Sequence, residues 1–564
     1  MNKHCSFPKL SFFFYVFLNL ITAILSVSVA IIIELTINIV NENQANNFKN
    51  IIFIAVIFII LYFLLNYIRT VYMQKLLDNY IVNLRNLLFK KIMGYSFPTF
   101  RKYSVSEYLS ILTNDVQTYQ EGALKSKLYV TQYMISATIV IFTLSLTNIY
   151  ITLLVILCTI ITCAIPRFFN SKISFKQEQV SIGLLNITEN TENNLEGFYV
   201  VNTYATQQRT WKKYEEINSL YNHQKFSLDK LISRGETLSM TFSVATELII
   251  LFVSANLVFT GTLTIGEMVA VMQLTGAFVQ PLMMITQNLP KIAGGKALEE
   301  RFLSIITTES NDIEKNIELS VLPFNSKIQL NSIYFSYGNG KNILNSINLI
   351  IEKGKKYAFI GGSGAGKTTL INIINGLYKP SSGFITVDDQ RIVSMNYQSY
   401  LNLFATVGQN TFLFNTTILD NITLMKEVDK KRLEKACQFS GVSDMLTNFK
   451  DGINEKIQDN GANLSGGQKQ KIALARALYH NKSVLILDEG LSAIDKKTAY
   501  DLEKNLLKTE NITLLSITHD IASPFLNKYD EIIFLENGMI KEADNYVGLS
   551  KNSKSFKSFI NELG

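Results

Sequence analysis

Cysteine, histidine and proline are all scarce in this sequence. Its 564 residues include four cysteines, four histidines and eight prolines. No Cys-x-x-Cys pair occurs, and the histidines lack metal-ligand spacing, which excludes the common zinc and redox motifs. No basic patch interleaved with aromatic residues is present either, so the formal charge of +7 does not indicate nucleic-acid binding. The charge fits instead the lysines and arginines that membrane proteins retain in their cytoplasmic loops.

Apolar sequence is abundant. Hydrophobic residues make up 48% of the chain, the mean hydropathy is +0.17, and the length predicts two or more domains. Six apolar stretches predict membrane spans at residues 11–40, 51–68, 130–146, 150–166, 238–260 and 266–287. The first stretch is too long for a cleavable signal peptide and has no cleavage site after a short core.

Two of the connections between these stretches are long and basic. Residues 69–129 and 167–236 each contain nine lysines or arginines. The positive-inside rule predicts that both connections, and both chain termini, are cytoplasmic. In both connections apolar residues recur at helical spacing, and glycine and proline are rare. We therefore expect membrane helices that continue into the cytoplasm and turn back. The alternative is two soluble insertions, although neither connection contains a strand-rich core.

The composition changes towards the C-terminus. Residues 1–306 are predicted to form the membrane domain, and the polar segment 307–326 is predicted to be a linker. From residue 327 onward, short β-branched runs alternate with helical segments, which predicts an α/β domain with a largely parallel sheet at 327–564.

A glycine-rich segment follows the apolar run 357–360 and opens a helical run at 370–377. Its residues are Gly361, Gly362, Ser363, Gly364, Ala365, Gly366, Lys367, Thr368 and Thr369. This pattern matches the phosphate-binding P-loop, in which backbone N–H groups and a helix N-terminus surround phosphate oxygens. Lys367 is predicted to neutralise the β- and γ-phosphates of ATP, and Thr368 is predicted to ligate Mg²⁺.

A second apolar run, 483–487, ends in two carboxylates. Asp488 is placed to hold the Mg²⁺ shell, and Glu489 is placed to deprotonate or orient an attacking water. Many strands end in acids, so the run by itself is weak evidence. Together with the P-loop it predicts an ATP hydrolase.

A third segment also begins a helix at an anion-binding position. Ser465, Gly466, Gly467 and Gln468 precede the helical run 469–479. One nucleotide does not need two such sites in one domain. The segment is therefore predicted to meet a nucleotide held by another subunit.

Together these segments resemble the ATP-binding cassette family, and with the six spans the whole chain resembles a bacterial half-transporter of the exporter type. The resemblance implies a six-helix membrane domain fused to an α/β P-loop domain, with ATP and Mg²⁺ as cofactors and a second half-transporter as partner, in a homodimer or a heterodimer. It implies a multi-pass protein of the cell membrane that exports an unidentified amphipathic drug, lipid or peptide. The alternatives are an importer with the exporter fold and an ATP-gated channel or regulator.

The resemblance also implies roles for single residues. Tyr337 resembles the aromatic residue that stacks on adenine, and Gln409 resembles the glutamine that contacts Mg²⁺ or water. Asp495 resembles the aspartate that communicates across the dimer, and His519 resembles the histidine that contacts the γ-phosphate. The turn at residues 465–468 would approach the partner's ATP.

Other segments match the family less closely or in layout only. Asp459 stands near the place of a usual glutamate, and Gly490 and Leu491 replace a usual pair of small residues. The segments 97–100, 112–115 and 197–201 resemble the cytoplasmic loops that carry coupling helices. Two acids, Glu34 and Glu247, lie inside apolar spans, where a carboxylate is a candidate site for cationic cargo. The alternative is that these two acids face water or a polar neighbour without contacting cargo.

Overall fold

The computed structural model describes residues 7–42, 45–308, 324–338, 340–392, 397–518 and 524–563. The chain divides into two compact units. The first contains Met1–Met93 and Tyr103–Ser310, and the second contains Gly94–Lys102 and Asn311–Gly564.

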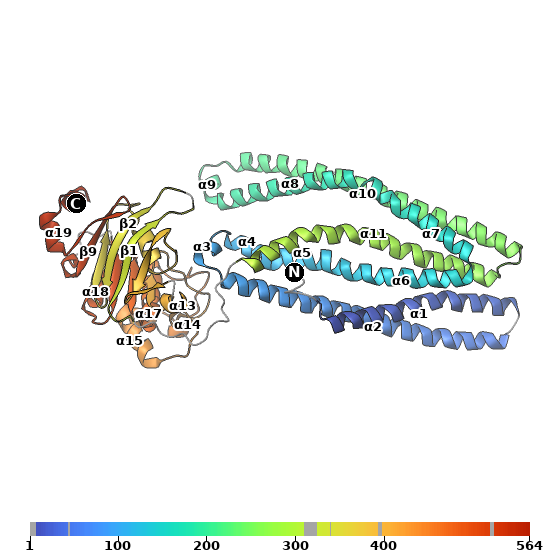
Figure 1. Cartoon of the computed structure of the whole chain (residues 1–564), viewed down its shortest axis with the longest axis horizontal. Helices are drawn as coiled ribbons and strands as arrows, with labels where there is room; N and C mark the ends of the chain where they lie inside the picture. The colour runs from blue at the N-terminus through green and yellow to red at the C-terminus, as the bar shows by residue number, and fades with distance from the viewer. Residues whose placement is uncertain are drawn as a thin grey trace. The chain divides into compact units, whose positions relative to one another are not determined.

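The first unit is built from long helices (Figure 1). They are α1 (Lys9–Asn41), α2 (Ala45–Met93), α4 (Val105–Ser110), η1 (Ile111–Asp115), α5 (Val116–Tyr119), η2 (Gln120–Leu124), α6 (Lys125–Thr147), α7 (Ile149–Ala164), η3 (Ile165–Phe168), α8 (Asn170–Glu196), α9 (Phe198–Thr203), α10 (Gln207–Phe259) and α11 (Ile265–Thr307). The five elements from α4 to α6 form one continuous helix, with π-helical turns at η1 and η2.

The apolar stretches lie within these helices. Among the described residues, five helices are long and apolar enough to cross a membrane, and α7, at the fourth predicted span, is an apolar helix of 16 residues. Six spans therefore remain a prediction. The 49 residues of α2 extend roughly 70 Å at about 1.5 Å per residue, well beyond a hydrocarbon core of about 30 Å. The predicted continuation of the membrane helices beyond their apolar segments is thus confirmed.

Helix α11 packs tightly against the continuous helix. A Cβ atom on Gly295 would lie 2.2 Å from the Cβ of Ala123 in η2, so the glycine permits this close approach. Farther along α11, Arg301 forms an ion pair with Asp115 at 2.6 Å, and Glu299 accepts hydrogen bonds from Lys127 at 2.7 Å and Tyr119 at 2.6 Å. The C-terminal end of α11 is therefore fixed to the first long connection by charged contacts.

The second unit contains two sheets and their covering helices. Its strands are β1 (Lys327–Phe335), β2 (Leu344–Glu352), β3 (Lys356–Ile360), β4 (Ser382–Val387), β5 (Gln390–Arg391), β6 (Phe404–Val407), β7 (Val484–Asp488), β8 (Thr513–Ile517), β9 (Glu531–Glu536) and β10 (Met539–Asp544). Its helices are α3 (Phe97–Phe100), α12 (Lys367–Ile374), α13 (Tyr397–Leu401), α14 (Ile418–Thr423), α15 (Lys430–Ser440), α16 (Val442–Leu446), η6 (Gly452–Asn454), α17 (Gly466–Tyr479), α18 (Lys496–Lys508), η7 (Leu526–Lys528), α19 (Tyr546–Asn552) and α20 (Lys554–Leu563).

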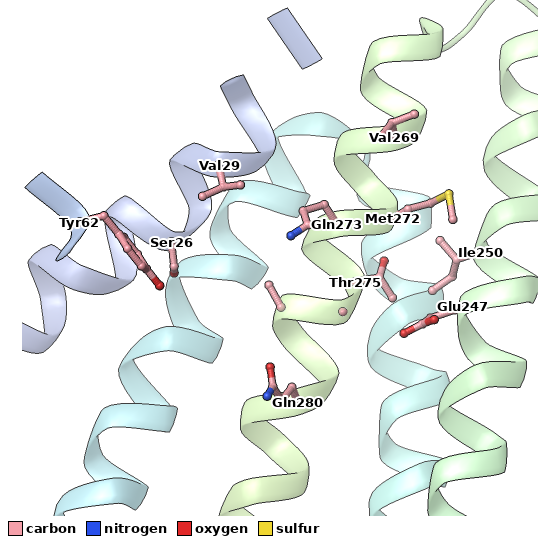
Figure 2. A pocket seen from close by; sticks show the side chains of 12 residues that line it. Ser26, Val29, Tyr62, Glu247, Ile250, Val269, Met272, Gln273, Thr275 and Gln280 are labelled. Atoms are coloured by element: carbon pink, nitrogen blue, oxygen red, sulfur yellow. The ribbon is translucent and has the colours of Figure 1, made fainter. Parts of the chain in front are cut away.

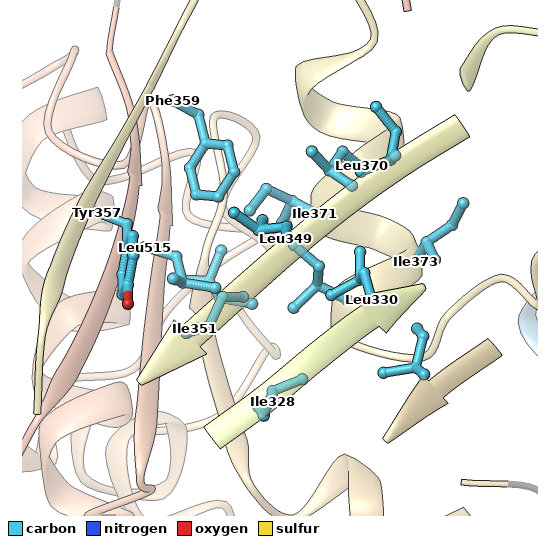
Figure 3. Packing of buried hydrophobic residues seen from close by; sticks show 14 of the residues in the cluster. Ile328, Leu330, Leu349, Ile351, Tyr357, Phe359, Leu370, Ile371, Ile373 and Leu515 are labelled. Atoms are coloured by element: carbon cyan, nitrogen blue, oxygen red, sulfur yellow. The ribbon is translucent and has the colours of Figure 1, made fainter. Parts of the chain in front are cut away.

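The larger sheet has the strand order β10-β9-β3-β8-β7-β6, and all its pairings except β10 with β9 are parallel. The predicted parallel sheet is confirmed. The smaller sheet, β2-β1-β4-β5, is antiparallel. Apolar side chains from both sheets and from α12 form one buried cluster, in which Leu330, Phe359 and Leu370 meet (Figure 3). This core holds the start of α12 rigidly against the end of β3.

Candidate nucleotide site

The predicted site residues follow the carboxyl ends of neighbouring parallel strands. The P-loop follows β3, Gln409 follows β6, and Glu489 follows β7. The strand between β3 and β7 is β8, whose last residue Ile517 pairs with Asp488. In open α/β sheets this edge is where ligands bind.

The P-loop makes a tight turn between β3 and α12. A Cβ on Gly361 would lie 2.2 Å from the carbonyl oxygen of Leu535 in β9, so only glycine fits there. Gly366, with φ 97°, adopts the left-handed conformation that glycine favours, directly before α12. The residues at the tip of the loop, Gly362, Ser363 and Gly364, are exposed. A ligand can therefore reach the tip of the loop, and the two ends of the loop are fixed.

Lys367 bends back over this loop. Its Nζ donates to the carbonyl oxygens of Gly361 at 2.7 Å and Gly362 at 2.9 Å, and the residue is only 6% exposed. Burial lowers the pKa of Lys367, whereas the carboxylates of Glu489 and Asp488 raise it. The ammonium group is thus held where the P-loop and the two acids converge.

Two of the three predicted Mg²⁺ ligands, Thr368 and Asp488, lie side by side. Thr368 Oγ1 donates to Asp488 Oδ1 at 3.4 Å, which joins the first turn of α12 to the end of β7. In an octahedral Mg²⁺ shell with ligands at about 2.1 Å, neighbouring oxygens are about 3 Å apart. The hydroxyl and the carboxylate therefore suit adjacent positions around one ion.

Glu489 and Gln409 are in direct contact. Gln409 Nε2 donates to Glu489 Oε2 at 2.9 Å. Glu489 has φ 52°, a left-handed conformation that costs a residue other than glycine about 1–3 kcal/mol and is common at active sites. The next residue, Gly490, would place a Cβ 2.8 Å from the carbonyl oxygen of Val407. Gly490 therefore permits the close approach that brings Glu489 to Gln409.

Gln470 is a positioning residue that the sequence analysis missed. It is 2% exposed. Its Nε2 donates to the backbone oxygen of Glu489 at 3.4 Å, and its Oε1 accepts the N–H of Ala493 at 2.9 Å. Through these bonds helix α17 holds the turn after β7. The second glutamine after Ser465 was the only signal in the sequence, and its partners lie about twenty residues away.

The turn before α17 is a helix cap. Ser465 Oγ accepts the N–H of Gln468 at 3.2 Å, and Gln468 Oε1 accepts the N–H of Ser465 at 2.8 Å, which is a capping box. Ser465 and Gly466 are exposed, and a Cβ on Gly467 would lie 2.9 Å from the carbonyl oxygen of Ala493. No hydrogen bond among the described residues joins this turn to the P-loop of the same chain.

The remaining predicted residues are placed as follows. Asp495 caps α18 by accepting the N–H of Thr498 at 2.9 Å, and this bond lowers the pKa of Asp495. The hydroxyl of Tyr337 lies 3.4 Å from Thr369 Oγ1, and the residue is 46% exposed. Ala365 is buried between the two ends of the loop. His519 lies outside the described residues.

An aromatic chain connects Tyr337 to the segment 97–100. The ring of Tyr378 packs edge-on against Tyr337 at 5.3 Å and against Phe97 at 5.6 Å, measured between centroids. Phe97 belongs to α3, the short helix that groups with the second unit although it is far away in sequence. The segment that resembles a coupling helix is therefore packed next to the predicted adenine-stacking residue.

Two family descriptions match the chain. Residues 12–282 match the ABC transporter transmembrane region, and residues 344–492 match the ABC transporter domain. This chain belongs to the ABC transporters. Like other members it couples ATP hydrolysis to transport.

Several ABC proteins are similar over most of their length. An uncharacterised ABC transporter ATP-binding protein of Bacillus subtilis, YwjA, is 27% identical over 86% of this chain and 84% of its own. The ATP-dependent lipid A-core flippase of Coxiella burnetii is 26% identical over 87% of this chain and 83% of its own. A bacterial Atm1-family ABC exporter with ATP bound shares the fold, with a TM-score of 0.84, 18% identity and 98% of each chain covered.

Proposed function

We propose that the site at the sheet edge hydrolyses Mg²⁺–ATP with Glu489 as the general base. The observation that carries this proposal is the contact between Gln409 and Glu489 directly beside Asp488 and the P-loop. Gln409 holds the Glu489 carboxylate in one orientation, so that it can accept a proton from water next to the γ-phosphate. Lys367 and the P-loop N–H groups bind the phosphates, and Tyr337 stacks on the adenine.

Mg²⁺ is proposed to be held by Thr368, Asp488 and Gln409 together with the phosphates. The described residues contain no group of three His, Cys, Asp or Glu side chains that could hold a metal ion by themselves. This donor set suits Mg²⁺, which is usually bound through one or two carboxylates plus substrate phosphates. The ion would neutralise charge that develops on the phosphates.

The exporter is proposed to work as a pair of chains, here two copies. Ser465 and Gly466 are exposed, and among the residues that the structure describes no hydrogen bond joins their turn to the P-loop of the same chain. A capped helix start is suited to an anion. In a pair, the turn of one copy would cover the ATP on the P-loop of the other. Closure around ATP would favour one state of the membrane helices, and hydrolysis would release it.

The movement that accompanies closure around ATP would pass to the membrane helices through the short helices α3 and α9. The chain from Tyr337 through Tyr378 to Phe97 supports this role for α3. Helix α9 presents Phe198 and Tyr199 as exposed side chains, which suits docking on the partner's cassette. The cargo is proposed to be an amphipathic compound that leaves the cell, with the cassette and both termini in the cytoplasm.

The sidedness of ATP hydrolysis tests this proposal. In inside-out membrane vesicles, added ATP should be hydrolysed, and EDTA should abolish the activity until excess Mg²⁺ restores it, because the site faces the cytoplasm. Sealed right-side-out vesicles serve as the control and should hydrolyse added ATP only after they are made permeable. Equal hydrolysis in both kinds of intact vesicle would contradict the proposed orientation.

A further inference from the structure

A polar cavity lies among the membrane helices of the first unit. Its volume is about 590 Å³, and four helices supply its walls. Ser26 and Val29 come from α1, Tyr62 comes from α2, Glu247 comes from α10, and the remaining wall is formed mainly by α11. Figure 2 shows Gln273 and Gln280 on α11 between the α1 and α2 side chains and Glu247.

One face of α11 carries two polar side chains with two small residues between them. Gln273, Gly276, Ala277 and Gln280 all line the cavity, and their spacing of three, four and seven residues places them on one side of a helix. A Cβ on Gly276 would meet no atom within 4 Å. The glycine therefore leaves room between two amide side chains, each of which can donate and accept hydrogen bonds.

Glu247 brings a negative charge to this cavity without a cation to balance it. None of the twelve lining residues is Lys, Arg or His. The six apolar stretches of the sequence contain Glu34, Glu247 and Glu267 and lack Lys, Arg and His altogether. Among the residues that the structure describes, no hydrogen bond or ion pair reaches the Glu247 side chain. A carboxylate at membrane depth is costly unless it faces water or a cation.

We infer that this cavity is a cargo subsite that selects an amphipathic organic cation. Glu247 supplies the opposite charge, Tyr62 adds an aromatic ring of the kind that attracts cations, and Gln273 and Gln280 accept or donate hydrogen bonds. Val29, Ile250 and Met272 supply apolar surface for the rest of the molecule. This inference names the cargo class of the proposed exporter, and so it rests on the proposed function.

Glu34 does not share this position. It lies on α1, eight residues beyond Ser26 and outside the lining of the cavity. Near it, a Cβ on Gly266 would lie 2.8 Å from the Glu34 backbone oxygen, so this part of α1 packs closely against the start of α11. Of the two acids that the sequence singled out, only Glu247 belongs to the cation subsite.

The experiment uses the purified full-length chain in lipid and two probes of the same shape and opposite charge. Tetraphenylphosphonium should stimulate ATP hydrolysis, and the anion tetraphenylborate should not. In Glu247→Gln, the tetraphenylphosphonium concentration for half-maximal stimulation should rise at least about tenfold, because the carboxylate that attracts the cation at membrane depth is lost. Glu247→Asp keeps the charge and should restore most of the response, and the control Glu34→Gln should respond like the wild type.

A second variant tests whether the cargo needs the empty volume of the cavity beside Gly276. Gly276→Leu places its side chain in the cavity, and it should reduce stimulation by tetraphenylphosphonium while retaining Glu247. An unchanged half-maximal concentration in Glu247→Gln would overturn the inference. Equal stimulation of the wild type by both probes would also overturn it, and so would a wild type that hydrolyses ATP without responding to tetraphenylphosphonium. Hydrolysis without any probe reports separately on the proposed function, because that activity depends on Glu489 and not on the cation.

Discussion

Glu489→Gln should abolish ATP turnover and leave ATP bound. The substitution preserves the size of the side chain and its contact with Gln409 but removes the group that accepts a proton. General-base catalysis contributes about 10²–10⁴-fold, and we expect a loss of that size in kcat. Phosphate release measures turnover, and retention of labelled ATP after gel filtration measures trapping.

The matched control is Glu510→Gln. Glu510 is exposed in the same cassette, just beyond the end of α18. This change should leave kcat within about twofold of the wild type, as is usual for surface substitutions. If Glu489→Gln hydrolyses ATP at the rate of this control, Glu489 is not the base.

Lys367→Met should lose ATP binding as well as turnover. Methionine approximates the length of the lysine side chain but cannot bind phosphate, and it leaves the carbonyl oxygens of Gly361 and Gly362 without their donor. Hydrogen bonds to charged groups contribute about 1.5–3 kcal/mol, which corresponds to roughly 10–100-fold weaker binding of ATP. Equilibrium binding of a fluorescent ATP analogue measures the effect.

Lys508→Met controls for the loss of a positive charge. Lys508 lies exposed at the end of α18, so its replacement should leave ATP affinity unchanged. The melting temperature of Lys367→Met without nucleotide separates damage to the P-loop from lost phosphate contacts. Wild-type ATP affinity in Lys367→Met would remove Lys367 from the site.

The sequence predicted those parts of the site that are continuous in the chain. The P-loop, the acids after β7 and the capped turn at Ser465 each combine a strand or helix boundary with a short pattern, so local rules suffice to find them. The alternation of β-branched runs and helices likewise predicted the parallel sheet. The apolar stretches predicted where the apolar parts of the long helices lie, because such stretches can be recognised from composition alone.

The contacts between distant segments could not be predicted in this way. Gln470 holds the turn after Glu489 from another helix, and in the sequence Gly490 is only a departure from the family pattern. Glycine is needed at position 490 because Val407 approaches it closely, and this approach depends on how β6 and β7 pair. The separation of Glu247 from Glu34 also depends on helix packing, since both acids look alike in the sequence.

Chemical cross-linking between two differently tagged copies tests the composite site most directly. One copy carries Ser363→Cys in its P-loop, and the other carries Ser465→Cys, both in a Glu489→Gln background without the four native cysteines. With ATP, a short bis-maleimide should join the two copies, and without ATP the product should be weak or absent. If ATP yields no such product while each copy still binds the nucleotide, the two surfaces do not meet, and a shared ATP site is contradicted.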